Sequence, residues 1–325
     1  MKKPLVLIAG PTASGKTSSS VCLAKKLDGE IISADSMQVY KGMDIGTAKV
    51  KPEEMEGIPH YMLDECLPAE GCDIAFFKEK VQNYIAAIHA KGKVPILVGG
   101  TGFYINAILF DTEFEETNND FTLRENLFAL AEKEGVEKLH KRLERVDPIS
   151  AKAIHPNNVK RVIRALEYYE QTGLPISSHN EKEKSKRLEN SSPYDYTFFA
   201  LTMKRETLYS RINQRVDQML SEGLVEEVRS FYEAGLREDA VAMKAIGYKE
   251  FFPYFRGEAS LENCVLKLKQ HTRNYAKRQL TWLKHQANPH FIEVDQYHFD
   301  TSRITEVMLS YLGKLTKKES KIRIE

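Results

Sequence analysis

Residues 10–17 read GPTASGKT and have the composition and spacing of a phosphate-binding loop. They follow the pattern G-x-x-x-x-G-K-T between a short apolar run and a helix-like segment, the context that this pattern requires. Gly10 and Gly15 let backbone N–H groups converge on an anion, the following helix adds its positive end, and Lys16 supplies a mobile charge. Thr17 can hold a Mg²⁺ ion. Because nothing in the loop reads adenine, its ligand could be ATP or another molecule with a diphosphate group.

Two further segments follow expected strands and could carry chemistry. Asp35 ends the apolar segment EIISAD, which places its carboxylate at the carboxyl edge of a parallel sheet, where open α/β sheets bind ligands. It could ligate Mg²⁺ or accept a proton, or it could cap a turn. The stretch 99–104, GGTGFY, would let backbone approach a ligand and would point Thr101 into the same crevice, unless it is only a tight turn. Thr47 and Lys49 of DIGTAK could touch phosphate or simply finish a loop.

Basic side chains gather on expected helices. Arg211 and Arg215 are spaced i, i+4 and share a face suited to a phosphate group, although solvated surface arginines are equally expected. Residues 152–164 form a basic run that contains no acidic residue. At about 100° per residue, the late helix 261–286 has a basic face opposite an apolar one. The basic face carries Arg273, Lys277 and Lys284, and the apolar face carries Leu268, Tyr275 and Trp282.

Such segregated charge on a chain with a net charge of only +1 favours a protein that grips a nucleic-acid backbone, although either patch alone could be a solvated face. Four cysteines are too few for a disulfide scaffold, and Cys66 with Cys72 gives at most half a zinc site, so we interpret all four as structural. No run approaches the about 18 apolar residues of a membrane span, so we expect a cytoplasmic protein, and we expect it to be a monomer.

The element pattern predicts an α/β fold with a parallel sheet. Short apolar runs at 4–9, 30–35 and 93–98, with an amphipathic helix at 76–91, indicate a doubly wound core. Helical periodicity then dominates, and the strand pattern returns at 196–203. Acidic segment 111–120 and polar segment 176–193 are expected to be linkers or lids. We therefore expect a core over 1–111, a helical insertion over 112–195, the rest of the core with basic helices over 196–316, and a tail over 317–325.

Seven segments, in order, resemble one enzyme family. They are GPTASGKT, DSMQVYKGMDIGTAK, PHYMLD, VGGTGFY, HPNNVKRVIRALE, AIGYKE and RNYAKRQLTWLK, and the chain from about residue 4 to about residue 295 closely resembles bacterial tRNA dimethylallyltransferases, also called tRNA isopentenyltransferases. The family transfers a dimethylallyl group from dimethylallyl diphosphate to N6 of the adenosine immediately 3′ of the anticodon, in tRNAs that read codons beginning with U. The resemblance implies a core like that of P-loop NTPases, Mg²⁺ as cofactor, and the anticodon stem-loop of tRNA as partner. It also implies that the helical insertion over 112–195 binds tRNA.

The resemblance also implies site residues. The family's catalytic aspartate and threonine correspond to Asp35 and Thr101. The donor diphosphate would be held by Gly10, Pro11, Thr12, Ala13, Ser14, Gly15, Lys16 and Thr17, together with Arg215. Contacts with tRNA would come from Asp35, Ser36, Met37, Gln38, Thr101, Arg124, Lys160, Arg161, Val162, Ile163 and Arg164, and from Arg273, Lys277 and Lys284 of the late helix.

Two other activities would use the same loop. A P-loop kinase of a small hydroxylated metabolite would use Asp35 to accept the hydroxyl proton and Thr17 to hold Mg·ATP. A nucleic-acid-binding NTPase without group transfer is less expected, because EIISAD is the only apolar strand segment that ends in a clear Walker-type acid.

Overall fold

The structure, a computed structural model, describes residues 2–113, 121–189 and 191–322. The chain divides into two compact units. The core unit comprises Met1–Leu109 and Pro193–Glu325, and the insertion unit comprises Phe110–Ser192. The helical insertion was expected over 112–195. The observed unit starts two residues earlier, at 110, and ends three residues earlier, at 192.

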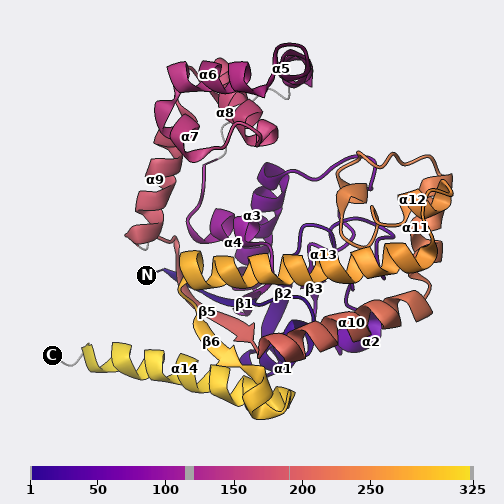
Figure 1. The fold of residues 1–325 in the computed structure, drawn as a ribbon. Coiled ribbons are helices and arrows are strands. Elements are labelled where there is room, and N and C mark those ends of the chain that lie inside the picture. The colour runs from indigo at the N-terminus through magenta and orange to yellow at the C-terminus, as the bar shows by residue number, and fades with distance from the viewer. Residues whose placement is uncertain (1, 114–120, 190, 323–325) are drawn as a thin grey trace. The chain divides into compact units, whose positions relative to one another are not determined.

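A parallel sheet forms the centre of the core unit (Figure 1). Among the described residues it has six strands in the order β3-β2-β4-β1-β5-β6, and every pair is parallel. The middle strands are apolar and buried on both faces, as expected for parallel strands covered by helices. The strands are β1 Lys3–Ala9, β2 Gly29–Ala34, β3 His60–Tyr61, β4 Val94–Gly99, β5 Tyr194–Thr202 and β6 His290–Glu293.

Helices cover both faces of this sheet. On one face, α1 (Lys16–Leu27), α10 (Arg205–Ser221) and α14 (Thr301–Ile322) share a hydrophobic core with alternate strand residues such as Ile8 and Phe199. On the other face lies α3 (Ile74–Ala90), which packs on β2 and β4 and against α4 (Gly102–Leu109). Successive strand residues point to opposite faces, so the apolar strand runs supply both cores.

The remaining helices of the core unit, apart from the short α2, lie in the carboxyl-terminal half of the chain. Figure 1 shows the long helix α13 (Leu261–Trp282), which packs along α10. The last turn of this helix continues as a π-helical segment, Leu283–Ala287. The shorter helices are α2 Pro52–Met55, α11 Leu224–Glu233, α12 Phe252–Phe255, and the 3-10 turns Ala242–Lys244 and Val294–Tyr297.

The insertion unit is helical and has its own hydrophobic core. Leu127, Leu139, Leu143 and Leu166 are buried together in it. Helices α5 and α6 are separated at Gly135, whose φ of 91° lies in the left-handed region that glycine tolerates best. The helices are α5 Phe121–Glu134, α6 Val136–Val146, α7 Pro148–Ala153, α8 Val159–Thr172 and α9 Ile176–Leu188.

Several expectations from the sequence need correction. Segment 176–193, expected to be a linker or lid, contains the helix α9. Only Glu183 of this helix is buried, so its sequence has no apolar helical periodicity. Of the expected tail, residues 317–322 continue helix α14, and 323–325 lie outside the described residues. The described part of segment 111–120 ends at residue 113. Strand β3 and helix α4 were not predicted.

Among the residues that the structure describes, no helix combines the length and the apolar character needed to span a membrane. The four cysteines are free thiols.

Candidate active site

Three loops meet at the carboxyl edge of the sheet because their strands are in register. Ala9 and Ala34, the last residues of β1 and β2, both pair with Gly99 at the end of β4. The residues that follow are Gly10, Asp35 and Gly100, so the phosphate-binding loop, the candidate acid and the GGTG segment lie side by side. This edge is where parallel α/β sheets bind ligands.

The phosphate-binding loop leads directly into α1, which begins at Lys16. A β-carbon on Gly10 would lie 2.8 Å from the carbonyl oxygen of Leu201 and 2.8 Å from Oγ of Ser14, so this position has no room for a side chain. Oγ of Ser14 is buried and has no hydrogen-bond partner among the described residues. Buried hydroxyls are normally paired, so an unpaired one inside such a loop indicates a ligand that supplies an acceptor or donor.

Lys16 lies within this loop, where its Nζ donates to the carbonyl oxygens of Gly10 at 3.1 Å and Pro11 at 2.8 Å. Burial, together with the positive charge of Arg215, lowers the pKa of Lys16 to about 8, while the negative charge of Asp35 opposes this shift. Burial also lowers the pKa of Arg215, against the carboxylates of Glu54 and Asp35. Two desolvated cations therefore interact with the carboxylate of Asp35, and they favour an anionic ligand.

The structure distinguishes the two arginines on α10. Nε of Arg211 donates to the carbonyl oxygen of Ala13 at 2.9 Å, and its guanidinium lies 4.4 Å from the ring centre of Phe299. Arg211 thus braces the phosphate-binding loop from outside. Arg215 interacts electrostatically with both Lys16 and Asp35, so it has the better position for an anion in the loop.

Asp35 combines the two interpretations that its sequence left open. Its Oδ1 accepts a hydrogen bond from the backbone N–H of Met37 at 2.9 Å, which closes a turn. Its other carboxylate oxygen forms no hydrogen bond with another described residue, and the side chain is only partly buried. The turn therefore fixes the orientation of the carboxylate and leaves one oxygen available to accept a proton.

Thr101 stands beside Asp35 at the start of α4. Its Oγ1 is buried and has no hydrogen-bond partner among the described residues. The hydroxyl of Tyr275 lies within interaction range but does not form a well-aligned hydrogen bond with it. The pKa of Tyr275 is raised to about 12, chiefly by burial and further by the negative charge of Asp35, with Thr101 and Gln279 opposing. The candidate residues Lys16, Asp35, Thr101 and Arg215 thus meet in one site.

Gln279 on α13 is a site residue that the sequence interpretation missed. Its Oε1 accepts from the backbone N–H of Thr12 at 3.2 Å, and its Nε2 donates to the carbonyl oxygen of Gly100 at 3.1 Å. It is 7% exposed and links the phosphate-binding loop to the GGTG segment. At about 100° per residue it falls on the apolar face of its helix, so a lone amide on that face was the available signal.

The loop DIGTAK does not present phosphate-binding groups. Oγ1 of Thr47 donates to the carbonyl oxygen of Met43 at 2.6 Å. Nζ of Lys49 donates to the carbonyl oxygen of Tyr40 and pairs with Asp44 and Asp64, and its side chain is 6% exposed. Both residues finish and brace a loop, which was the plainer of the two alternatives.

The expected RNA-facing residues of α13 divide by exposure. Lys277 and Lys284 are exposed, and neither forms an ion pair with another described residue. Arg273 is half-buried, donates to Oδ1 of Asn213 at 2.7 Å, and braces α13 against α10. On the opposite side of the helix Leu268 is buried, while Tyr275 and Trp282 are partly buried, as the helical period predicts.

In the insertion unit, Lys160, Arg161 and Arg164 are exposed along α8. Between them, Val162 and Ile163 are 1% and 2% exposed in the core of the unit, so their side chains are not presented to RNA, and a contact of this stretch with tRNA stays a prediction. Residues on opposite faces of one helix cannot all face RNA.

Arg124 makes a two-pronged ion pair with Glu167, at 2.6 Å from Nε and 2.9 Å from Nη2. Its guanidinium is therefore already engaged, although half of the side chain is exposed. Arg124 holds α5 against α8, whatever contact it makes with RNA.

A divalent metal would have oxygen ligands of the kind Mg²⁺ prefers at the phosphate-binding loop. No cluster of three His, Cys, Asp or Glu side chains suited to a metal exists among the described residues. Mg²⁺ usually binds through one or two side chains together with substrate phosphates and water, so it does not need such a cluster. Thr17, at the start of α1, fits that arrangement.

Comparison with known proteins places this chain among close relatives. The model of the family described as IPP transferase matches residues 38–286, a span that starts after the phosphate-binding loop and Asp35. The tRNA dimethylallyltransferase of Lachnoclostridium phytofermentans is 51% identical over 306 residues, which cover 94% of this chain and 96% of that protein. The tRNA dimethylallyltransferase of Geobacillus kaustophilus is 49% identical, covering 97% of this chain and 98% of that protein.

Solved structures give the same picture. The tRNA isopentenylpyrophosphate transferase of Staphylococcus epidermidis superposes with a TM-score of 0.70 at 47% identity, covering 96% of this chain and 100% of that one. A eukaryotic dimethylallyltransferase acting on tRNA superposes with a TM-score of 0.78 at 30% identity, covering 96% of this chain and 80% of that one. The structural neighbours share the P-loop NTPase-like core predicted from the sequence.

Proposed function

This chain belongs to the IPP transferase family and transfers a dimethylallyl group to tRNA, and from that premise we propose which residues perform the reaction. The donor is dimethylallyl diphosphate. Its diphosphate lies in loop 10–17, where Lys16 and Arg215 supply two desolvated cations and Ser14 offers an unpaired buried hydroxyl. The same relatives argue against the kinase and the NTPase, which would use this loop for a nucleoside triphosphate.

The acceptor is N6 of the adenosine 3′-adjacent to the anticodon, in tRNAs that read codons beginning with U. An exocyclic amine is a poor nucleophile because its lone pair is delocalised into the ring. The open oxygen of Asp35 accepts a hydrogen bond from N6–H, orients the amine and takes its proton as the N6–carbon bond forms. The base must leave its stack to reach this crevice, as in other enzymes that act on a base.

The bond between the allylic carbon and the diphosphate oxygen breaks in the same step, and diphosphate leaves. Lys16 and Arg215 stabilise the negative charge that grows on it, and both are already in place before reaction. Bound Mg²⁺, with Thr17 as a ligand, would neutralise part of that charge. Thr101, with its unpaired buried hydroxyl beside Asp35, binds the reacting groups.

One observation carries this assignment: Asp35, fixed by its turn, interacts with both Lys16 and Arg215 at the end of the phosphate-binding loop. A proton acceptor and an anion site therefore lie together, as a transfer from an organic diphosphate requires. We further propose that the protein acts as a monomer on the anticodon stem-loop in the cytoplasm, where tRNA is found. The oligomeric state is measured by light scattering on the purified chain, alone and with tRNA.

The substitution Asp35→Asn tests the proton acceptor, because the amide keeps the shape and loses the basicity. General-base contributions are about 10²- to 10⁴-fold, so single-turnover transfer should fall by that order while tRNA affinity changes little. Asp28→Asn is the matched control, since Asp28 is exposed and caps the far end of α1. Near-normal transfer by Asp35→Asn would overturn the assignment.

A further inference from the structure

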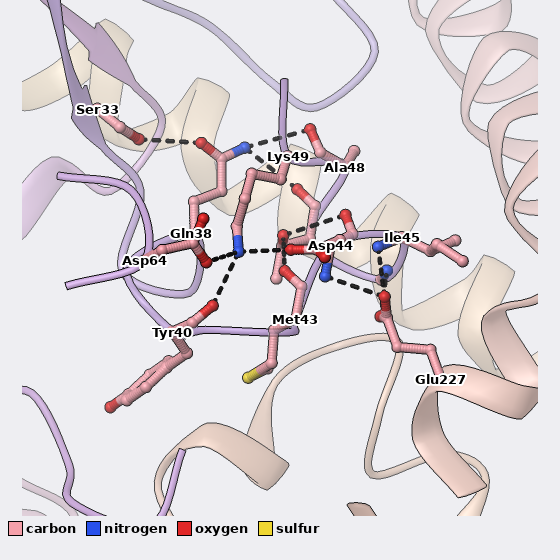
Figure 2. A network of polar contacts seen from close by, with 12 residues as sticks. Ser33, Gln38, Tyr40, Met43, Asp44, Ile45, Ala48, Lys49, Asp64 and Glu227 are labelled. Carbon is pink, nitrogen blue, oxygen red and sulfur yellow. Dashed lines mark hydrogen bonds and ion pairs between the residues drawn. The ribbon is translucent and has the colours of Figure 1, made fainter. Parts of the chain in front are cut away.

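The carboxylate of Glu227, on α11, holds a loop that lies far from it in the sequence (Figure 2). Its Oε2 accepts from the backbone N–H groups of Asp44 at 3.0 Å and Ile45 at 2.7 Å, and its Oε1 accepts from that of Gly46 at 3.0 Å. The hydroxyl of Tyr248 also donates to Oε1, at 2.5 Å. Consecutive N–H groups turned inward make an anion site, and here the anion is a side chain of the same protein.

This anchor leaves the loop little freedom. A β-carbon on Gly46 would lie 2.5 Å from the ring of Tyr248, whose own side chain is fully buried. The backbone N–H of Lys49 donates to the carbonyl of Asp44 at 2.9 Å, and that of Ala48 to the carbonyl of Ile45 at 3.0 Å. Residues 44–49 therefore form one compact turn whose position depends on Glu227.

The carbonyl groups of this turn hold the side chain of Gln38. Its Nε2 donates to the carbonyl oxygens of Thr47 and Ala48, both at 3.3 Å, and its Oε1 accepts from Oγ of Ser33 at 3.0 Å. The amide nitrogen of Gln38 can donate to two carbonyl groups and its amide oxygen cannot donate, so the orientation of the amide is fixed. Both of its N–H groups are in use, and Figure 2 shows the amide between Ser33 and Ala48.

The last link reaches Asp35. Oγ of Ser33, 6% exposed as a residue, donates to Gln38 and accepts from the backbone N–H of Asp35 at 3.3 Å. A hydroxyl that donates on one side and accepts on the other transmits the position of the amide to the backbone that carries the carboxylate.

We propose that Glu227 is a positioning residue for the transfer reaction, acting through the 44–49 turn, Gln38 and Ser33 to set the place of Asp35. The inference rests on the proposed role of Asp35 as proton acceptor. It assigns Gln38 to this relay, since its amide N–H groups are not available to hydrogen-bond a base of the RNA. The phosphate-binding loop is not a member of the relay.

Two substitutions break the relay at opposite ends. Glu227→Gln keeps the shape of the side chain but replaces one acceptor oxygen with a donor that faces backbone N–H or the tyrosine hydroxyl. Ser33→Ala removes only the hydroxyl. Displacements of about 1 Å at a reacting group can cost 10²-fold, so each variant should lower single-turnover transfer about 10- to 100-fold at saturating tRNA and donor. Affinity for inorganic diphosphate should stay unchanged.

Matched controls and a double-mutant cycle separate positioning from general damage. Glu226→Gln changes the neighbouring, exposed carboxylate on the same helix and should transfer normally. In the Asp35→Asn background, Glu227→Gln and Ser33→Ala should lower the rate little further, because the group they position is already inactive. Thermal unfolding of each variant is followed alongside, and Ser33→Ala carries the test if Glu227→Gln does not fold.

Three results would overturn the inference. Transfer by Glu227→Gln and Ser33→Ala equal to that of Glu226→Gln would remove the relay. An equal loss of diphosphate affinity would show loosening of the whole site, and an undiminished effect in the Asp35→Asn background would show that neither residue acts through Asp35. Normal transfer by Asp35→Asn alone would instead overturn the proposed proton acceptor, and this inference with it.

Discussion

A β-carbon on Gly100 would lie 2.0 Å from Nε2 of Gln279, the atom that donates to the carbonyl of Gly100 itself. The amide of Gln279 therefore fills the space that any other residue at position 100 would need. Its other end accepts from the backbone of Thr12 in the phosphate-binding loop. Because Gly100, which follows β4, has no side chain, Gln279 of α13 can reach the phosphate-binding loop that follows β1.

Gly100→Ala should therefore weaken binding of inorganic diphosphate. The added methyl group must push Gln279 away from Thr12, and overpacking of this kind costs about 1–3 kcal/mol, which would be about 5- to 150-fold if it fell entirely on affinity. Titration calorimetry measures this directly. Gly313→Ala is the control, because a β-carbon there meets no atom within 4 Å. An unchanged affinity in Gly100→Ala would show that Gln279 does not support the loop.

The lowered pKa of Lys16, about 8, predicts how diphosphate affinity depends on pH. A bound anion favours the charged amine, so the pKa of Lys16 is higher in the complex than in the free protein. Binding then takes up a proton between these two pKa values. Affinity should be insensitive to Lys16 below about pH 8 and should fall above it, by up to about tenfold per pH unit.

Diphosphate affinity is measured against pH for Lys16→Met as well. That profile contains the ionisation of diphosphate itself, and it is subtracted from the profile of the unmodified protein. The difference in log affinity between the two proteins should be constant below about pH 8, should shrink as the pH rises above 8, and should level off where the lysine of the complex also loses its proton. A difference that is constant from pH 7 to 10 would mean that burial does not lower the pKa of Lys16 in solution.

The site residues that could be predicted from the sequence are those that follow apolar strand runs. Gly10, Asp35 and Thr101 come after short buried runs, and the carboxyl ends of parallel strands necessarily meet at one edge. Gln279 and Glu227 could not be placed in this way. Each holds a loop that lies more than 170 residues away in the sequence, and neither local periodicity nor motif spacing encodes a partner at that distance.

Secondary structure shows the same division. The strands β1, β2, β4 and β5 could be predicted because each contains a short, mostly apolar run. Helix α9 is almost entirely polar, so its sequence has the character of a linker, and the helix contacts α7 and α8 of the same unit. The two-residue strand β3 is too short to produce an alternating pattern.

Arg124→Ala should destabilise the insertion unit. The side chain of Glu167 is 4% exposed, so removing its partner leaves a buried carboxylate without compensation. Loss of one partner of a fully buried pair costs about 3–5 kcal/mol, and since Arg124 is half exposed we expect about 1–3 kcal/mol. Urea unfolding measures the loss. Arg142→Ala is the control, because its partner Glu170 is 36% exposed and a surface pair contributes about 0–1 kcal/mol.

Adding Glu167→Leu to Arg124→Ala separates stability from recognition. The apolar side chain removes the unpaired charge, so the stability of the unit should return. If tRNA affinity returns with it, Arg124 acts only by holding α5 to α8. Affinity that stays low in the restabilised double variant would show a direct contact between Arg124 and RNA.

Neutralising Lys277 and Lys284 should weaken tRNA binding in a way that depends on salt. Both side chains are exposed, Lys277 on α13 and Lys284 on the π-helical segment that continues it, and α13 contacts the active-site loops through Gln279. Each lost phosphate contact removes about 0.7–0.9 units from the slope of log affinity against log salt concentration. The variant Lys277→Gln/Lys284→Gln should therefore reduce that slope by about 1.5, while single-turnover transfer at saturating tRNA stays near normal.

The charge change itself needs a control, because removing any two lysines alters the net charge. Lys3 and Lys26 are exposed at the opposite edge of the sheet, where β1 begins and α1 ends. Lys3→Gln/Lys26→Gln removes the same two charges and should leave the salt slope unchanged, since long-range attraction is screened within about 10 Å at 0.1 M salt. Equal slopes for the two double variants would mean that α13 senses only overall charge, and its basic face would then be a solvated surface rather than a site for the RNA backbone.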